Sequence, residues 1–416
     1  MSINRISSNT INDNGVFHLR NREYSMDKVN NQINTGKKNR LPRENVVDVT
    51  QSMTYHTKIQ KIDQYIRNID DAEAERGLVE VKLNESIQIL QRARELAVQS
   101  ANGTYTEEDR KSMAIEIDQL LRQVVQDSNT KFKGDFLFSG FQKYTKPFEA
   151  LEGAVKGIND AMITKVKYLG DNGVHLREVD AGEYIGVAKP GSEIYWAENF
   201  QIYSPVNTAN FRLTKDQNIL IDGIKIEFKE GDNAYAVMDK INRSNAAINA
   251  SIDIVNGGMI LSTTRPHKPE LADIEGGTLL QDLGILERGR PMGPENLNPD
   301  ATVFGGSIFD TLIGLRDSMI HNNSEDIGGR FLGALDFAIS NLTYNMAETG
   351  AKDNRLGYLT ARHTDDKIVY TEALTKTEDI DLAEAITELK MLDFAHKAAL
   401  SSLARLAKTS LMDFLR

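Results

Sequence analysis

A heptad pattern at the end of the chain constrains the fold of this sequence more than any other feature. Between residues 381 and 414, mostly apolar side chains recur at alternating steps of three and four. The positions are Leu382, Ala385, Leu389, Leu392, His396, Ala399, Leu403, Leu406 and Ser410. This spacing predicts an α-helix with one apolar face of the coiled-coil type. Because such a helix is marginal alone in water, the face requires a partner.

The start of the chain carries a second, weaker heptad pattern. Residues 13–35 predict a helix that ends at Gly36, with Pro42 beyond it. Its repeat runs through Val16, Leu19, Glu23, Met26, Asn30 and Ile33. The two terminal faces can pack on each other or on copies in neighbouring subunits. An apolar heptad face is more often ordinary core than an assembly surface, but its presence at both termini favours assembly.

We therefore predict a terminal seam, defined as the apolar heptad positions of both end helices. Its residues are Val16, Leu19, Met26, Ile33, Leu382, Leu389, Leu392, Ala399, Leu403 and Leu406. His396 lies on the same face, and we interpret it as a partly buried residue with a polar partner rather than a metal ligand or pH sensor.

The region after the first helix predicts an antiparallel helical hairpin. A long helix begins near Val46, and charged residues around Gly77 interrupt its apolar spacing, which predicts either a shifted face or a kink. Asn102-Gly103 ends this helix, and Thr106 caps the next one. The candidate residues of this rod-domain hairpin are Leu90, Arg94, Leu96, Ala97, Asn102, Gly103, Ile117 and Leu120. Its apolar faces need a third or fourth element to cover them.

The middle of the chain changes to a period-two pattern. Asp222-Gly223 and Asn256-Gly257 stand between alternating apolar residues, which predicts two hairpins, and residues 234–246 between them predict one short helix. Helical patterns resume near Ser307. The predicted fold is mainly α with an inserted β-rich domain, and the N- and C-terminal segments form a long helical coiled-coil bundle.

We predict three domains from these patterns. Residues 1–45 and 376–416 form a terminal coiled-coil layer. Residues 46–149 and 301–375 form a helical rod domain, and residues 150–300 form the β-rich insertion.

Composition excludes several functions. A net charge of −11 argues against a nucleic-acid binder, which needs a basic surface for phosphate contact. The chain has no cysteine, so disulfides, Cys-zinc sites and thiol catalysis are excluded. No catalytic or nucleotide-binding motif is present, and we predict a non-enzyme without catalytic, cofactor-binding or metal residues. The polar N-terminus predicts no signal peptide, and no apolar run is long enough for a membrane span.

Several segments resemble the flagellin superfamily. The sequence at 32–45 (QINTGKKNRLPREN) and 90–110 (LQRARELAVQSANGTYTEEDR) is similar to characteristic segments of its N-terminal region. The sequence at 218–246 resembles its β-rich middle motif, and that at 378–415 its shared C-terminal helix. The stretch GDFLFSGFQKYTKPF at 134–148 is similar to the hook–filament junction members.

One departure concerns the loop after the first helix. Arg43-Glu44 stands where the superfamily often has paired acidic residues, which leaves the contacts of that loop open but not the resemblance.

The resemblance implies a structural protein of the bacterial flagellum that joins the hook to the filament. The terminal helices are expected to form the innermost layer and to order on assembly, with the β-rich insertion facing outward. Expected partners are further copies of the chain, a neighbouring hook-associated junction protein, flagellin and an export chaperone, but neither nucleic acid nor membrane. Export through the flagellar type III system is expected, into an external or periplasmic flagellum.

Three alternatives stay open. A minor flagellin of the filament would polymerise into long filaments. A coiled-coil adhesin or secreted effector would carry its function in the β-rich domain, and an enzyme would need a motif that is absent here.

Overall fold

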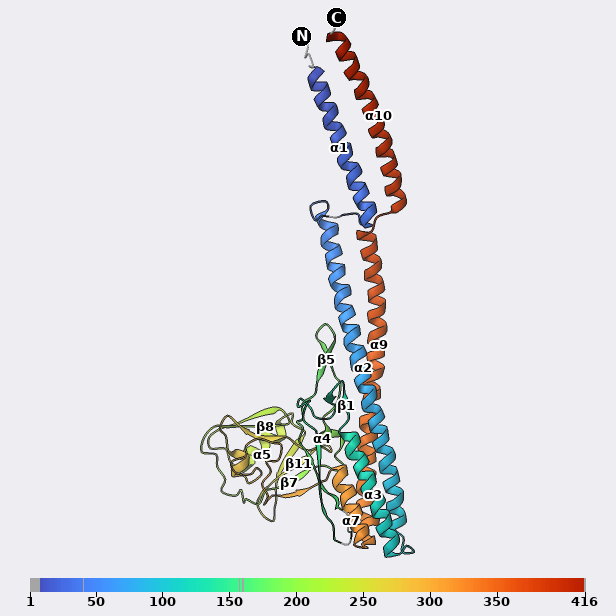
Figure 1. Ribbon diagram of the computed structural model, residues 1–416. Coiled ribbons are helices and arrows are strands. Elements are labelled where there is room, and N and C mark those ends of the chain that lie inside the picture. The colour runs from blue at the N-terminus through green and yellow to red at the C-terminus, as the bar shows by residue number, and fades with distance from the viewer. Residues whose placement is uncertain (1–7, 40, 157, 159–160, 415–416) are drawn as a thin grey trace. The chain divides into compact units, whose positions relative to one another are not determined.

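The computed structural model describes residues 8–39, 41–156, 158 and 161–414. The chain divides into two compact units, Met1–Ile66 with Thr360–Arg416, and Arg67–Leu359. Both boundaries fall inside long helices rather than in loops, so this division differs from the three predicted domains. The predicted class is confirmed, because the two ends of the chain form long helices and the segments between them in the sequence form the strands (Figure 1).

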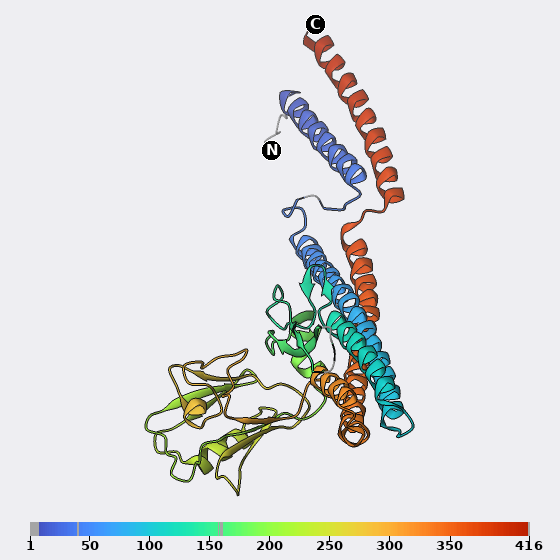
Figure 2. The same cartoon turned by 60° about the horizontal axis from the view of Figure 1, so that its bottom comes forward.

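The first unit contains the two terminal helices, α1 (Ser8–Thr35) and α10 (Leu382–Phe414). They lie side by side and antiparallel, as Figures 1 and 2 show. The unit also holds the first part of α2 (Val46–Ala101) beside the last part of α9 (Leu332–Glu378). Helix α1 ends as predicted, because Gly36 adopts a positive φ of 72° and its N–H donates to the Gln32 carbonyl.

The second unit contains a helical bundle made of the rest of α2 and α9 with α3 (Glu107–Ser128) and α7 (Ile308–Ile320). Helix α7 is capped by Ser307, whose side chain forms a capping box with Asp310. A short α8 (Ser324–Asp326) and a π-helical turn (Ile327–Phe331) lead into α9. The bundle supplies the third and fourth elements that the predicted hairpin requires.

Helix α2 is continuous through the region where its apolar pattern is interrupted. Its buried face passes from Ile69 and Ala72 to Arg76 and Val79, all at most 3% exposed. The steps from Ile66 to Ile69 and from Ile69 to Ala72 are both three, which moves the face by one residue relative to the earlier spacing, and two steps of four through Val79, Leu83 and Ile87 return it. Of the two predicted outcomes, the shifted face is therefore the one observed.

The strands are all paired antiparallel. One sheet has the order β10-β11-β7-β13 and another the order β12-β8-β9, while β1-β2, β3-β4 and β5-β6 are two-stranded. The bounds are β1 Lys131–Phe132, β2 Asp135–Phe136, β3 Phe148–Ala154, β4 Ala161–Tyr168, β5 Leu176–Asp180, β6 Glu183–Gly186, β7 Gln201–Tyr203, β8 Gln217–Ile221, β9 Ile224–Phe228, β10 Ile248–Ile252, β11 Met259–Thr263, β12 Leu271–Ile274 and β13 Thr302–Phe304. Three short helices accompany them, α4 Gly191–Ile194, α5 Ala234–Arg243 and α6 Leu279–Asp282.

Both predicted hairpins are confirmed. Asp222 and Gly223 both have positive φ, 48° and 77°, and join β8 to β9 in a two-residue turn. Asn256-Gly257 lies in a longer loop between β10 and β11. The predicted short helix between them is α5, capped by Asn233.

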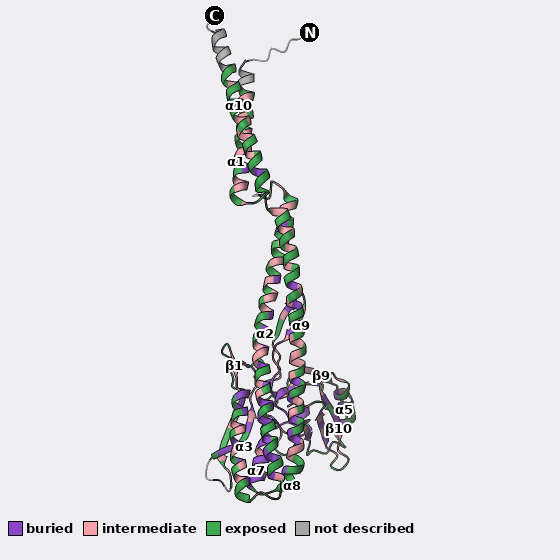
Figure 3. Cartoon of the chain, turned by 90° about the vertical axis from the view of Figure 1, so that its right-hand side faces the viewer, coloured by how far each residue is buried: buried purple, intermediate pink, exposed green. Residues whose placement is uncertain are grey.

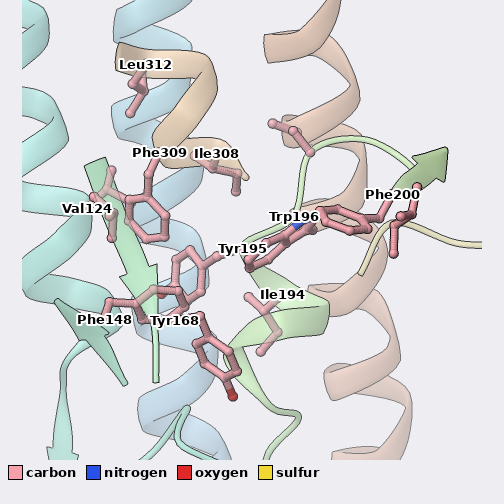
Figure 4. Close-up of a cluster of buried hydrophobic side chains, with 14 of the residues drawn as sticks. Val124, Phe148, Tyr168, Ile194, Tyr195, Trp196, Phe200, Ile308, Phe309 and Leu312 are labelled. Atoms are coloured by element: carbon pink, nitrogen blue, oxygen red, sulfur yellow. The ribbon is translucent and has the colours of Figure 1, made fainter. Parts of the chain in front are cut away.

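An aromatic cluster joins the β-rich part to the helices of the second unit (Figure 4). The ring of Phe148 on β3 lies 4.9 Å from that of Phe309 on α7 and 5.3 Å from that of Tyr195 after α4. All three side chains are at most 1% exposed. Aromatic pairs at such distances add to the free energy gained by burying their area, so the cluster anchors the insertion to the rod.

Candidate assembly surfaces

The described part of the terminal seam on α1 faces α10 through Leu19, Met26 and Ile33, which are half-buried. Val16 is 40% exposed and lies at the edge of the face. Val29, which the sequence analysis left out, is only 4% exposed. The sequence could have indicated this position, because the apolar Val29 stands next to the polar Asn30 and fits the heptad face better.

Likewise, Arg22 rather than the predicted Glu23 occupies the position on α1 that faces α10. Its side chain is half-buried, and its guanidinium donates to the Ala395 carbonyl of α10 at 2.6 Å. An arginine can line an apolar face because its methylene stem packs while its charged end finds an acceptor. Residues 22 and 29 therefore belong to the face, and Glu23 and Asn30 are exposed.

On α10, the predicted heptad residues follow one face. Ala385 is 2% exposed, and Leu389, Leu392, Ala399 and Leu403 are half-buried. Leu382 is 51% exposed at the start of the helix. The side chain of Leu406 lies outside the described residues.

The two terminal helices approach closely where α1 carries a glycine. A Cβ added to Gly15 would lie 2.3 Å from Cδ2 of Leu403. His396 is half-buried on the same face of α10, and its Nε2 lies 4.0 Å from the Glu23 carboxylate. The pair thus has a glycine on α1 where the Leu403 side chain of α10 packs, and a polar contact between His396 and Glu23.

The terminal helices keep apolar side chains that the chain itself does not cover. On α1, Phe17 is 59% and Tyr24 66% exposed, and on α10, Met391 is 62% and Phe394 76% exposed. Figure 3 shows how much of both helices is exposed. Both terminal helices thus keep apolar surface that the described part of the chain leaves open.

The segment that follows α1 and the segment that precedes α10 are hydrogen-bonded to each other within the first unit. The Lys38 N–H donates to the Glu378 carbonyl at 2.7 Å, and the Ile380 N–H donates to the Gly36 carbonyl at 3.0 Å. The Glu378 carboxylate contacts the Lys37 ammonium and accepts from His56 Nε2 at 2.8 Å. Burial raises the pKa of Glu378, but hydrogen bonds from Lys37 and His56 outweigh it and hold this pKa below its ordinary value.

In the rod-domain hairpin, the predicted apolar residues face the core. Leu90, Ala97 and Ile117 are 0% exposed and Leu96 is 2% exposed. Leu120 is half-buried. The hairpin is therefore held by the same bundle that it helps to form.

The other predicted hairpin residues lie at the surface. Arg94 is exposed and pairs with Asp336 of α9, with 2.6 Å between Nε and Oδ1. Asn102 and Gly103 are exposed in the turn, and Thr106 forms the expected N-cap with a capping box to Asp109.

The turn of the hairpin depends on Arg110, which the sequence analysis missed. This side chain is 6% exposed, and it donates to the carbonyls of Ser100 at 2.8 Å and Asn102 at 3.1 Å. It also contacts the Asn322 side chain. Nothing in the local pattern distinguishes this arginine from its solvent-exposed neighbours.

A second missed residue is Arg76, which the apolar pattern had marked as an interruption. It is 2% exposed, and its Nε donates to Asp353 of α9 at 2.5 Å. The same guanidinium donates to the carbonyls of Gly186 and Val187, and it contacts the Thr349 carbonyl. Arg76 thus joins α2, α9 and the end of β6.

A third missed residue is Arg316 on α7, which is 0% exposed. Its guanidinium donates to Asp118 of α3 at 2.7 Å, to the Ile163 carbonyl of β4 at 2.6 Å, and to Asp317. Asp118 is 4% exposed and also accepts from Arg122 at 3.0 Å. The buried ion pair connects two helices of the rod with the first hairpin of the insertion.

Three family models match successive parts of the chain. The bacterial flagellin N-terminal helical region matches residues 6–143, the flagellin hook IN motif residues 210–265, and the bacterial flagellin C-terminal helical region residues 332–415. Together they cover about two thirds of the chain in the order of the resemblance. The chain belongs to the flagellin superfamily.

Relatives in this superfamily include both filament and hook-associated proteins. Flagellin A of Vibrio anguillarum is 24% identical over 376 residues, covering 90% of this chain and 89% of that protein. Flagellar hook-associated protein 3 of Escherichia coli is 24% identical over 192 residues, covering 46% of this chain and 56% of that protein.

Solved structures similar to this flagellin-superfamily chain include flagellar hook-associated protein 3 from Legionella pneumophila. It has a TM-score of 0.47 and 18% identity, covering 78% of this chain and 98% of that one. A FlgL from Xanthomonas campestris has a TM-score of 0.43 and 16% identity, and the match covers 76% of this chain and 98% of that one.

The segment 134–148, on which the resemblance to junction members rests, links the helical rod to the insertion. Phe138 and Phe148 are buried in the aromatic cluster. Gly140 has a φ of 68°, and a Cβ there would lie 2.5 Å from the Asp171 carbonyl oxygen, so only glycine fits. The Tyr168 hydroxyl donates to the Phe138 carbonyl at 3.0 Å and closes the segment.

Over the ranges that the structure describes, no group of three or more His, Cys, Asp or Glu side chains is placed to hold a metal ion. Within the same ranges, none of the helices combines the length and the apolarity that crossing a membrane requires.

Proposed function

We propose that this chain is a structural protein of the bacterial flagellum that joins the hook to the filament as a junction layer. The observation that carries the proposal is the terminal helix pair. Its two helices come from opposite ends of the chain, contact each other, and leave Phe17, Tyr24, Met391 and Phe394 exposed. Identical subunits that repeat a contact of this kind without closing it form a helical layer.

The three predicted domains complete this proposal. Residues 1–45 with 376–416 form the inner layer, residues 46–149 with 301–375 the rod layer, and residues 150–300 the outer surface. The expected partners are further copies of this chain, the neighbouring hook-associated junction protein, flagellin and an export chaperone. Export would use the flagellar type III system, and no enzymatic role is proposed.

The segment 134–148 supports the junction role over the filament role. Its sequence resembles that of junction members, and hook-associated protein 3 is among the relatives. A second candidate function is a minor flagellin. It is favoured by the relatives named flagellin, of which one matches 90% of this chain.

Deletion of the gene distinguishes the two candidates. If the chain is a junction protein, electron microscopy of the deletion strain will show hooks without filaments, and flagellin will accumulate in the medium. Filaments that remain attached, but are shorter or altered, would identify a minor flagellin and contradict the proposal.

The assembly role of the terminal seam can be tested with Leu403→Asp. A carboxylate at this half-buried position, where Leu403 packs against Gly15 of α1, would enter an apolar contact between the helices, so incorporation into flagella should be lost. Ser402→Asp is the matched control, because residue 402 is exposed on the same helix. Fluorescence of Trp196, the only tryptophan of the chain, reports whether the second unit stays folded. Normal incorporation of a folded Leu403→Asp protein would refute the role of the seam.

A further inference from the structure

The sequence contains four Asn-Gly pairs, at residues 14–15, 102–103, 172–173 and 256–257. An asparagine followed by glycine is chemically labile, because no side chain on the glycine hinders attack of its backbone nitrogen on the asparagine side-chain amide. The reaction needs that nitrogen free to leave the peptide plane. The four pairs are equivalent in sequence, so the structure decides which of them can react.

Two pairs are protected in the β-rich part of the second unit. The Gly173 N–H donates to the Asp171 carboxylate at 2.9 Å, and the Asn172 side-chain amide is held by Ser192 at 2.5 Å and by Asp222 at 3.0 Å. The Gly257 N–H donates to the Asp253 carbonyl at 2.8 Å. In both pairs the attacking nitrogen is bound.

A third pair lies within helix α1. Residues 14 and 15 are surrounded by helical turns, where each N–H donates to the carbonyl four residues before it. Gly15 also packs closely against Leu403 of α10. The helix therefore fixes the peptide bond that the reaction must rotate.

In the fourth pair, Asn102-Gly103, the attacking nitrogen is not bound, although the Asn102 carbonyl accepts from Arg110 at 3.1 Å and from the Tyr105 N–H at 3.4 Å. Both residues are exposed in the hairpin turn, and the Gly103 N–H has no hydrogen-bond partner within the described ranges. A Cβ on Gly103 would meet nothing within 4 Å, so water reaches the bond. The Asn102 Oδ1 accepts from the Thr104 N–H at 3.3 Å, which holds the side-chain amide over the turn and polarises its carbonyl.

We propose that Asn102 is a site of spontaneous deamidation in the folded chain. Hydroxide removes the Gly103 amide proton, and the nitrogen forms a bond to Cγ of Asn102. The Asn102 Nδ2 takes up a proton and leaves as ammonia, which gives a five-membered succinimide. Water then adds to one of the two ring carbonyls and opens the ring to aspartate or isoaspartate, with no change in oxidation state.

The modification changes the turn where Arg110 holds it. The Arg110 guanidinium donates to the main-chain carbonyl of Asn102 at 3.1 Å. In the isoaspartate product this carbonyl becomes a free carboxylate, and the main chain gains one carbon before Gly103. Deamidation therefore adds a negative charge and lengthens the tip of the rod-domain hairpin.

Peptide mass spectrometry of the full chain tests the proposal. The folded protein and the same protein in denaturant are incubated at mildly alkaline pH, and the acid fraction at each of the four asparagines is followed with time. In the folded protein, Asn102 should deamidate severalfold faster than Asn172 and Asn256. In denaturant the four rates should become similar, because only the sequence then acts.

Gly103→Ala provides the matched variant. Residue 103 has open space and no positive φ, so alanine fits without strain, and it should slow deamidation at Asn102 severalfold while the other three rates stay unchanged. The proposal is overturned if Asn172 or Asn256 reacts as fast as Asn102 in the folded protein. It is also overturned if Asn102 keeps its amide when folded but loses it in denaturant.

Discussion

Removing one partner of the buried ion pair between Arg316 and Asp118 should destabilise the second unit strongly, because the other charge is left buried and unpaired. Replacement by Arg316→Met keeps much of the side-chain volume but leaves the Asp118 carboxylate, 4% exposed, without its main partner. Breaking such a pair costs about 3–5 kcal/mol. Because Arg122 still donates to Asp118 at 3.0 Å, we expect a loss near the lower end, about 3 kcal/mol in the free energy of unfolding.

The assay is denaturant unfolding of the full chain followed by Trp196 fluorescence. This tryptophan is 7% exposed and belongs to the same unit and the same hydrophobic core as α7, so its signal reports the part of the chain that the substitution affects. Using one local probe matters, because a chain of two units need not unfold in a single step.

Arg92→Met is the matched control, because it removes an arginine that pairs with Glu116 and Glu95 at the exposed surface of the hairpin. Exposed pairs contribute little, so this variant should unfold close to the unmodified chain. The double substitution Arg316→Met with Asp118→Asn should cost less than Arg316→Met alone, because no unpaired carboxylate remains. If Arg316→Met costs no more than Arg92→Met, or if the double variant is the least stable, the reasoning is refuted.

Two further predictions use the same assay. Burial raises the pKa of Glu348, but hydrogen bonds and charges of Lys189 and Lys352 outweigh burial and lower this pKa from its ordinary value of 4.5 to about 2. The ionised carboxylate therefore stabilises the fold at pH values above 4.5, and this stabilisation is lost as the pH falls toward 2. Glu348→Gln should thus cost about 1–2 kcal/mol at neutral pH, and a difference that persists unchanged at the acid end would contradict the assignment. In Gly191→Ala, the new Cβ would lie 2.6 Å from the Phe148 ring and 3.0 Å from the Phe138 carbonyl oxygen. We expect the free energy of unfolding to fall by about 1–3 kcal/mol. An unchanged unfolding midpoint would mean that the aromatic cluster relaxes freely.

Local signals in the sequence predicted several of the element boundaries. Gly36, Thr106 and Ser307 each mark a helix end or start, and Asp222-Gly223 marks a hairpin. These residues act through their own backbone angles or through hydrogen bonds to residues two to four positions away. Such effects do not depend on the rest of the fold, so they can be recognised before it is known.

The apolar faces were only partly determined in this way. The period of the heptads predicted that α1 and α10 each present one face, and residues such as Leu19 and Leu392 lie on it. Which of two adjacent residues points inward, Val29 or Asn30, depends on the rotation of α1 against α10. That rotation is set by all contacts of the pair together, including the close approach of Gly15 to Leu403.

The buried charges were decided by the tertiary structure alone. Arg76, Arg110 and Arg316 look like surface residues in the sequence. Their acceptors lie on segments that are distant along the chain, except for the turn carbonyls of Arg110 and the Asp317 carboxylate next to Arg316. A charged side chain can be buried only where several acceptors converge on it. The sequence by itself therefore determined the long helices, several of their ends and the period of their apolar faces, because these are local. Only the tertiary structure decided where charge could be buried, because that requires acceptors from several elements to meet at one point.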